Sequence, residues 1–181
     1  MESQTLINDL IRLTQSNKAI VEKYTTLSEI QLNWKANNES WSILECIEHL
    51  NRYGAFYIPE IENRIKQSKS KASSVFNSNW LGRYFSKSVA YSPELKKMKT
   101  FKSMNPIHST LNTSVLQTFK DQQDDLINLL HQAKSVNLDK TKTSITISKL
   151  IKLKLGDTFR VVIYHNQRHI EQAKRNLELF K

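Results

Sequence analysis

Apolar residues recur every three or four positions over much of the chain, which is the period of an amphipathic α-helix. The first such stretch, residues 3–30, is regular except for one polar position, Asn17. It predicts a first helix across residues 3–30 with one apolar face. The residues expected on that face are Leu6, Leu10, Leu13, Ile20, Tyr24 and Leu27.

A second helix is predicted to begin near Ser42 and to continue to about residue 67. Ser42 is followed three residues later by Glu45, the spacing of a capping box, in which each side chain accepts a hydrogen bond from the other's backbone N–H. Pro59 lacks an N–H and is expected to kink the helix. Gly54 lies on the apolar face and should allow a neighbouring helix to approach closely. The inward positions are Ile43, Ile47, Leu50, Tyr57, Ile61 and Ile65.

The hydrophobic period is lost over residues 68–110, which contain Pro93 and Pro106. This segment is predicted to be a long crossover with short helical pieces. Its aromatic stretch NWLGRYF, residues 79–85, is expected to pack on the rest of the protein.

The helical period returns over residues 111–134, which predict a third helix. The following ITISKLIKL alternates as a strand does, although Ser148 within it could also cap a short helix. A fourth helix is predicted to start at Asp157 or Thr158 and to run to the C-terminus.

The composition agrees with this helical interpretation. The 181 residues include only 3 glycines and 3 prolines, too few for the many turns of a sandwich or barrel, and 39% are hydrophobic, enough for a core. Four helices with one long connection predict an all-α fold, a four-helix bundle with a crossover between helices two and three. The length predicts that residues 1–181 form a single domain.

The formal net charge is +10, and it is unevenly distributed. Residues 64–102 carry ten basic side chains and one acidic one, Glu94. This segment is either a solvated connection or a rim that attracts an anionic partner. The sequence has no zinc-finger spacing and no RNP-type aromatic run, so nucleic acid is not the expected partner.

Other features bear on location. Cys46 is the single cysteine, which excludes an internal disulfide and fits a reducing compartment. The N-terminal residues lack the basic start and apolar run of a signal peptide, and no stretch is apolar enough for a membrane span. A cytoplasmic protein without membrane contact is expected.

Two histidines, His165 and His169, lie four positions apart on the predicted fourth helix, so their side chains share one face at the margin of its apolar stripe. His49 has the same placement on the second helix. Three imidazoles from neighbouring helices would form a metal site with an open coordination position, suited to zinc and compatible with nickel, iron or manganese. The alternative is that these are ordinary histidines satisfied by hydrogen bonds.

The nearby polar residues leave several interpretations open. Asn166 replaces the glutamate of an H-E-x-x-H motif, which excludes that chemistry, and it could orient a histidine or bond to another helix. Cys46 could be a further ligand or a small buried apolar residue. His108 and His131 are interpreted as surface residues.

Two segments together resemble a known family. WSILECIEHL, residues 41–50, and YHNQRHIEQA, residues 164–173, resemble the DinB-like superfamily of metal-binding four-helix bundles, which includes DNA-damage-inducible and bacillithiol-transferase-like proteins. The matching positions are Trp41, Ser42, His49, His165, Arg168, His169 and Gln172.

This resemblance implies that His49, His165 and His169 bind one divalent ion, zinc or nickel. It also implies a thiol S-transferase whose partners are a low-molecular-weight thiol, such as bacillithiol, and a small electrophile; a homodimer is compatible with it. Arg83 and Arg168 are the candidates for binding the carboxylates of the thiol cofactor, although Arg168 could instead bond to a neighbouring helix or a dimer partner. The alternative is a non-catalytic stress-response or binding protein with a structural or incidental metal.

Overall fold

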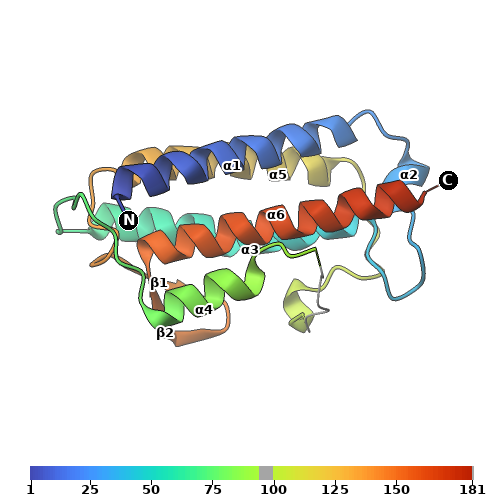
Figure 1. Cartoon of the computed structure of the whole chain (residues 1–181). Helices are drawn as coiled ribbons and strands as arrows, with labels where there is room; N and C mark the ends of the chain where they lie inside the picture. Colours follow the sequence, from blue (N-terminus) through green and yellow to red (C-terminus); the bar gives the residue numbers. More distant parts are fainter. Residues whose placement is uncertain (94–99, 181) are drawn as a thin grey trace.

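Four long helices dominate the computed structural model, which describes residues 1–93 and 100–180 (Figure 1). They are α1 (Ser3–Tyr24), α3 (Ile43–Gln67), α5 (Ser114–Ala133) and α6 (Leu155–Leu179). The predicted four-helix bundle is confirmed. Residues 94–99, which include Glu94, Lys96, Lys97 and Lys99 of the basic segment, lie outside the described residues.

The helices form a ring in which α1 and α3 each contact both α5 and α6. Helices α1 and α6 begin at one end of the bundle, and α3 and α5 begin at the other (Figure 1). Because α3 and α5 run in the same direction side by side, the chain between them must return along the full length of the bundle. The long crossover predicted between helices two and three makes this return.

The first helix ends earlier than the apolar pattern suggested, at Tyr24 instead of residue 30. The hydroxyl groups of Thr25 and Thr26 donate to backbone carbonyls of the last turn, which competes with continued helix formation. A separate short helix, α2 (Glu29–Asn33), then begins with Ser28 as its N-cap.

The second predicted helix agrees closely with α3. Ser42 and Glu45 form the capping box in both directions, and the helix continues through Pro59 to Gln67. A Cβ atom added to Gly54 would lie 2.0 Å from Oε1 of Gln122 on α5, so this glycine permits the close approach that was expected.

The aromatic part of the crossover forms α4 (Trp80–Val89), which packs on α6. Its contact face is made by small residues, because a Cβ atom on Gly82 would lie 1.9 Å from Oδ2 of the buried Asp157. The segment therefore packs on the rest of the protein as expected, although the side chains of Trp80 and Tyr84 are 70% and 62% exposed. The crossover also contains the 3-10 turn η1 (Lys102–Met104).

The ambiguous segment before the last helix is an antiparallel hairpin of β1 (Lys142–Ile145) and β2 (Ser148–Lys154). The strand interpretation is therefore confirmed, and the alternative in which Ser148 caps a helix is wrong. The hairpin contacts α3 and α6, and α6 follows it directly from Leu155, two residues before the predicted start.

The buried apolar residues form two clusters that follow each other along the bundle. Asn17, the polar position in the first apolar stripe, is buried and donates to the carbonyl of Ile163 on α6. In the described part of the chain, the helices lack the length or the apolar character needed to cross a bilayer. Helix α4, the hairpin and the end of the crossover lie together on one side of the bundle, over α3 and α6 (Figure 1).

Candidate metal centre

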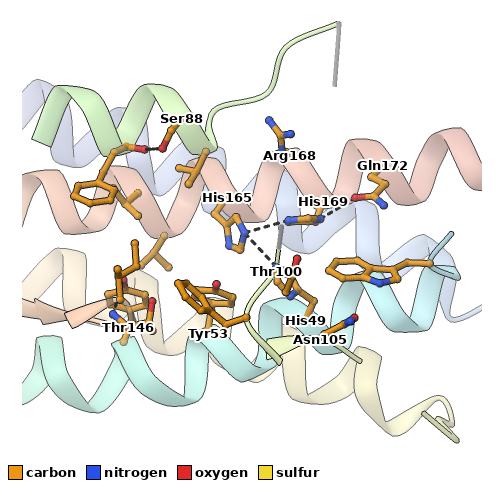
Figure 2. A pocket seen from close by; sticks show the side chains of 18 of the residues that line it. His49, Tyr53, Ser88, Thr100, Asn105, Thr146, His165, Arg168, His169 and Gln172 are labelled. Carbon is orange, nitrogen blue, oxygen red and sulfur yellow. Dashed lines mark hydrogen bonds between the residues drawn. The ribbon is translucent and has the colours of Figure 1, made fainter. Parts of the chain in front are cut away.

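Three histidines from two neighbouring helices meet beneath this cover (Figure 2). His49 comes from α3, and His165 and His169 lie one turn apart on α6. The Nε2 atom of His165 lies 3.3 Å from Nε2 of His49 and 3.1 Å from Nε2 of His169. The three histidines, which the sequence predicted at the margins of the apolar faces of two helices, therefore lie close together in the structure.

The opposite ring nitrogens of two histidines are held by hydrogen bonds. Nδ1 of His49 lies 2.7 Å from the carbonyl oxygen of Met104 in the crossover. Nδ1 of His169 lies 2.9 Å from Oε1 of Gln172, one turn further along α6. Both partners are acceptors, so each Nδ1 carries the hydrogen and donates it. Each Nε2 therefore presents a lone pair toward the centre of the cluster.

The histidines are uncharged in this setting. Burial lowers the pKa of His49 to about 4, opposed by its bond to Met104 and assisted by Arg52. Burial, together with the neighbouring His49, lowers the pKa of His169 to about 3. Burial, together with the neighbouring His169 and His49, lowers the pKa of His165 well below its ordinary value. At neutral pH all three imidazoles are therefore neutral, the form that binds metal ions.

The close nitrogen contacts are unfavourable without a cation. If Nε2 of His165 carried a hydrogen, that hydrogen could point directly at only one of the two neighbouring lone pairs. In at least one of the two contacts near 3 Å, the lone pairs of two nitrogen atoms would then face and repel each other. A divalent ion bound by all three nitrogens removes this conflict.

The spacing and chemistry of the donors also fit such an ion. In a tetrahedral shell with metal–nitrogen bonds of about 2.0–2.1 Å, ligand nitrogens lie roughly 3.3–3.4 Å apart. The two observed separations are close to this value, and the ligand atoms of all three residues lie within 4.8 Å of one another. The site therefore has the donors and the spacing for one divalent ion, with zinc and nickel both compatible.

Aromatic rings surround the imidazoles. The ring of Trp41 lies 4.6 Å from that of His49 and 5.5 Å from that of His169, between ring centres. The ring of Tyr53 lies 4.7 Å from that of His165. These contacts restrict the rotation of the ligand side chains and reduce the access of water to them.

One side of the histidine cluster faces a cavity of about 660 Å³. All three histidines line it, together with residues from the segment before α3, from α4, from the crossover and from the hairpin. This volume is in the range of small-molecule sites. A metal ion held by three imidazoles would keep a coordination position open toward this space, as catalytic zinc sites do.

The two candidate cofactor-binding arginines occupy different places. Arg168 is buried, lines the cavity and donates to the carbonyl of Ala90, and its side chain points away from the three histidines (Figure 2). Arg83 lies on α4, where it donates to the carbonyl of Ser78, and it is not among the residues that line the cavity. Their role in thiol binding stays a prediction, and the position of Arg83 does not support it.

The polar residues left open by the sequence have defined positions. Asn166 is buried and donates to Oε1 of Gln123 on α5, so its contact is between helices. Cys46 is fully buried beside apolar side chains and is not part of the histidine cluster. His108 and His131 are exposed, as predicted.

Some parts of the site had no recognisable signal in the sequence. The carbonyl of Met104 is a backbone group, which every residue possesses, so its role could not be found from residue types. Gln172 was found only as a position that matched the family pattern. The hairpin residues Ile145 and Thr146 line the cavity although their segment was not assigned to the site.

The fold and site define a class of protein, the helical bundles in which histidines of adjacent helices form a cluster that could hold a metal ion beside a pocket. More particularly, the chain belongs to the DinB superfamily, whose family model matches residues 12–173. A similar solved structure is that of YfiT from Bacillus subtilis, described as a probable metal-dependent hydrolase with an unusual four-helix bundle topology. The TM-score is 0.56 at 14% identity, and the match covers 94% of this chain and 85% of YfiT. A search of curated proteins found no match.

Replacing Gln172 with alanine tests the support of His169. The variant should bind zinc about 10–100-fold more weakly, the usual effect of losing a partner that orients a metal-bound histidine. Competition with a chelator of known affinity measures this. Gln167→Ala, a half-buried glutamine on the same helix outside the cavity, is the matched control and should bind zinc as the wild type does. Equal affinity of all three proteins would show that Gln172 does not support the ligand.

Proposed function

We propose that this protein is a divalent-metal-dependent enzyme that transfers a low-molecular-weight thiol to a small electrophile. The observation that carries the proposal is the convergence of three imidazole nitrogens whose open side faces a cavity. The membership in the DinB superfamily supports a metal-dependent activity without naming the reaction.

A divalent ion held by His49, His165 and His169 would supply Lewis acidity, which would lower the pKa of a thiol. The reaction forms a carbon–sulfur bond and breaks the bond between that carbon and a leaving group such as a halide. The thiol proton passes to solvent, and the leaving group departs with the bonding electron pair.

The protein's own residues hold this arrangement in place. Met104 and Gln172 fix the orientation of two imidazoles through their Nδ1 atoms. Trp41 and Tyr53 pack against the imidazole rings and restrict their rotation.

Hydrolysis is the second candidate, favoured by the description of YfiT as a probable metal-dependent hydrolase. A hydrolase activates water, whose pKa of about 15.7 is much higher than the value of about 8.5 for a thiol. The ion must therefore lower the pKa of water much further, and a nearby carboxylate often assists. Among the described residues that line the cavity, the one acidic side chain is Glu39, which is exposed. This chemistry favours the thiol over water.

A non-catalytic protein with a structural or incidental metal is the remaining alternative. Structural zinc sites are closed by four protein ligands. In the described part of the chain, the cluster of metal-binding residues contains three, and a cavity adjoins it. These observations support a catalytic site.

The test is to load the purified protein with zinc or nickel and to assay a fluorogenic haloalkyl electrophile with and without bacillithiol. We expect product formation that requires both metal and thiol, and its loss in His49→Ala to the rate of the uncatalysed reaction. Coenzyme A, cysteine and glutathione serve as alternative thiols. Consumption of ester or amide substrates without thiol would support hydrolysis instead. Inactivity of the metal-loaded protein in every assay would reject both catalytic proposals.

A further inference from the structure

The cavity has a different chemical character at its two ends. Figure 2 shows Thr146 at one end and Gln172 at the other, with the three histidines between them. The wall beyond the histidines on the Thr146 side is made of apolar and aromatic side chains, which we call the apolar arm. Its residues are Tyr57, Phe85, Ile145, Leu153, Val161 and Val162.

The apolar arm begins close to the metal ligands. Val161 precedes His165 by four residues on α6, which is about 6 Å along a helix axis. On the facing helix α3, Tyr57 follows Tyr53 by one turn, and their rings are nearly parallel, at 12°. The floor of the cavity therefore continues from the imidazoles into the arm without a charged side chain.

The opposite end offers polar groups beside the apolar side chains of Trp41 and Ile107. Asn37 and Ser40 line it from the segment before α3, and Asn105 and Gln172 line it from the crossover and α6. The hydroxyl group of Ser40 is bonded to the backbone of Asn37, and the three amide oxygens accept hydrogen bonds within the protein. The amide N–H groups of Asn37, Asn105 and Gln172 can donate to a polar molecule. The two ends therefore suit two chemically different ligand groups, one on each side of the histidines.

The rim of the apolar arm is also apolar and faces solvent. Tyr84 of α4 and Ile147 of the hairpin both line the cavity, yet they are 62% and 51% exposed. Trp80 lies one turn before Tyr84 on the same face of α4 and is 70% exposed. Large apolar side chains gathered at an opening indicate a route for an apolar ligand.

We propose that the apolar arm binds an alkyl or aromatic group of the substrate, while the polar end is left for a polar co-reactant. The substrates are thus small apolar molecules that carry a reactive atom, not sugars, nucleotides or other strongly polar molecules. The position of the reactive atom near the histidines rests on the proposed function. Binding of the apolar group does not depend on it, because burial of apolar area provides the affinity without any reaction.

A homologous ligand series tests this inference. Binding of phenol, 4-ethylphenol and 4-butylphenol to the full chain is measured by calorimetry, with and without equimolar zinc. The association constant should rise about threefold to fourfold for each added methylene, the value for transfer of a methylene group out of water. The rise should occur in both the metal-free and the zinc-loaded protein.

Two variants that fill the arm serve as the specificity test. Val161→Trp places a large side chain at a half-buried position of the wall, and Thr146→Trp does so from the hairpin turn, away from the bundle core. In either variant that keeps the wild-type circular dichroism spectrum, the association constant should no longer rise with the length of the alkyl group on the phenol. Leu177→Trp, at a half-buried position of α6 outside the cavity, is the matched control and should retain it.

The inference would be overturned if the association constant for the wild type did not change with alkyl chain length. It would also be overturned if both arm variants folded and kept the chain-length dependence of the wild type. These results differ from failure of the proposed function. Turnover of electrophiles without chain-length dependence would reject only the apolar arm. Chain-length dependence without turnover of any electrophile would reject only the enzyme.

Discussion

Zinc at about a thousand times its dissociation constant should raise the melting temperature of the metal-free wild-type protein by about 8–16 °C. Binding to the folded state alone contributes about 4 kcal/mol at that ratio, and each kcal/mol shifts the melting temperature of a chain of this size by about 2–4 °C. The donors are fixed and neutral before the ion arrives, which lowers the dissociation constant and hence the zinc concentration needed to reach that ratio.

His165→Ala should remove most of this stabilisation at the same zinc concentration. The Nε2 atom of His165 is the one that lies close to both other ligand nitrogens. Its loss should weaken zinc binding more than about 100-fold, because losing even an orienting partner costs up to that factor. Differential scanning fluorimetry on untagged protein, with and without zinc, measures the shift, and mass spectrometry of the purified protein measures the metal retained.

His131→Ala is the matched control, since His131 is an exposed histidine on α5. It should show the same zinc-dependent shift as the wild type. A shift of equal size in His165→Ala, or its absence in the wild type at saturating zinc, would contradict a metal site at these histidines.

The second large effect is expected at Glu45, a carboxylate with 2% of its side chain exposed. Its Oε2 accepts from the backbone N–H of Ser42 at 2.9 Å. Its Oε1 lies 2.6 Å from Nζ of Lys35 and accepts from the backbone N–H of His108 at 2.7 Å. One side chain therefore joins the start of α3, the segment before it and the end of the crossover.

Glu45→Ala should lower the free energy of unfolding by about 3–5 kcal/mol, the range for breaking a buried ion pair from one side. The melting temperature should fall by roughly 6–20 °C. The reason is that Ser42 and His108 lose the acceptor for their N–H groups, while Lys35 loses its counter-ion. Urea denaturation monitored by circular dichroism measures the loss.

Two further variants show whether the burial of Glu45 is the cause. Glu45→Gln keeps one acceptor oxygen and should cost less than alanine. Glu62→Ala removes an exposed ion pair with Lys66 on the same helix and should change stability by no more than about 1 kcal/mol. Similar losses of unfolding free energy in Glu45→Ala and Glu62→Ala would show that the buried contacts of Glu45 contribute no more than an exposed ion pair.

The histidine cluster could be predicted because side-chain type and helical period both carry information about it. His165 and His169 share a face by spacing alone, and His49 lies on the margin of its own apolar stripe. The capping box at Ser42 was predicted for the same reason, since its two side chains act locally. These features depend on residues close together in the sequence.

The rest of the site depends on long-range packing. Helix α4 contacts α6 through Gly82, so Trp80 and Tyr84 turn outward, and no local pattern distinguishes that orientation from the opposite one. The first helix ended early because the hydroxyl groups of Thr25 and Thr26 compete with the helical hydrogen bonds, although the apolar period continues beyond them. The apolar arm depends on the hairpin, whose alternating pattern was compatible with two structures.

The distance between the three clustered histidines along the chain has a consequence for biosynthesis. His49 and His165 are separated by 116 positions, and two of the three histidines lie on α6, the last helix. A ribosome-bound chain that has not yet produced α6 therefore offers one ligand of the three, and it cannot assemble the site. Metal capture is expected only after translation of α6 and its docking against α3, so metal content reports the fraction of chains that have completed folding.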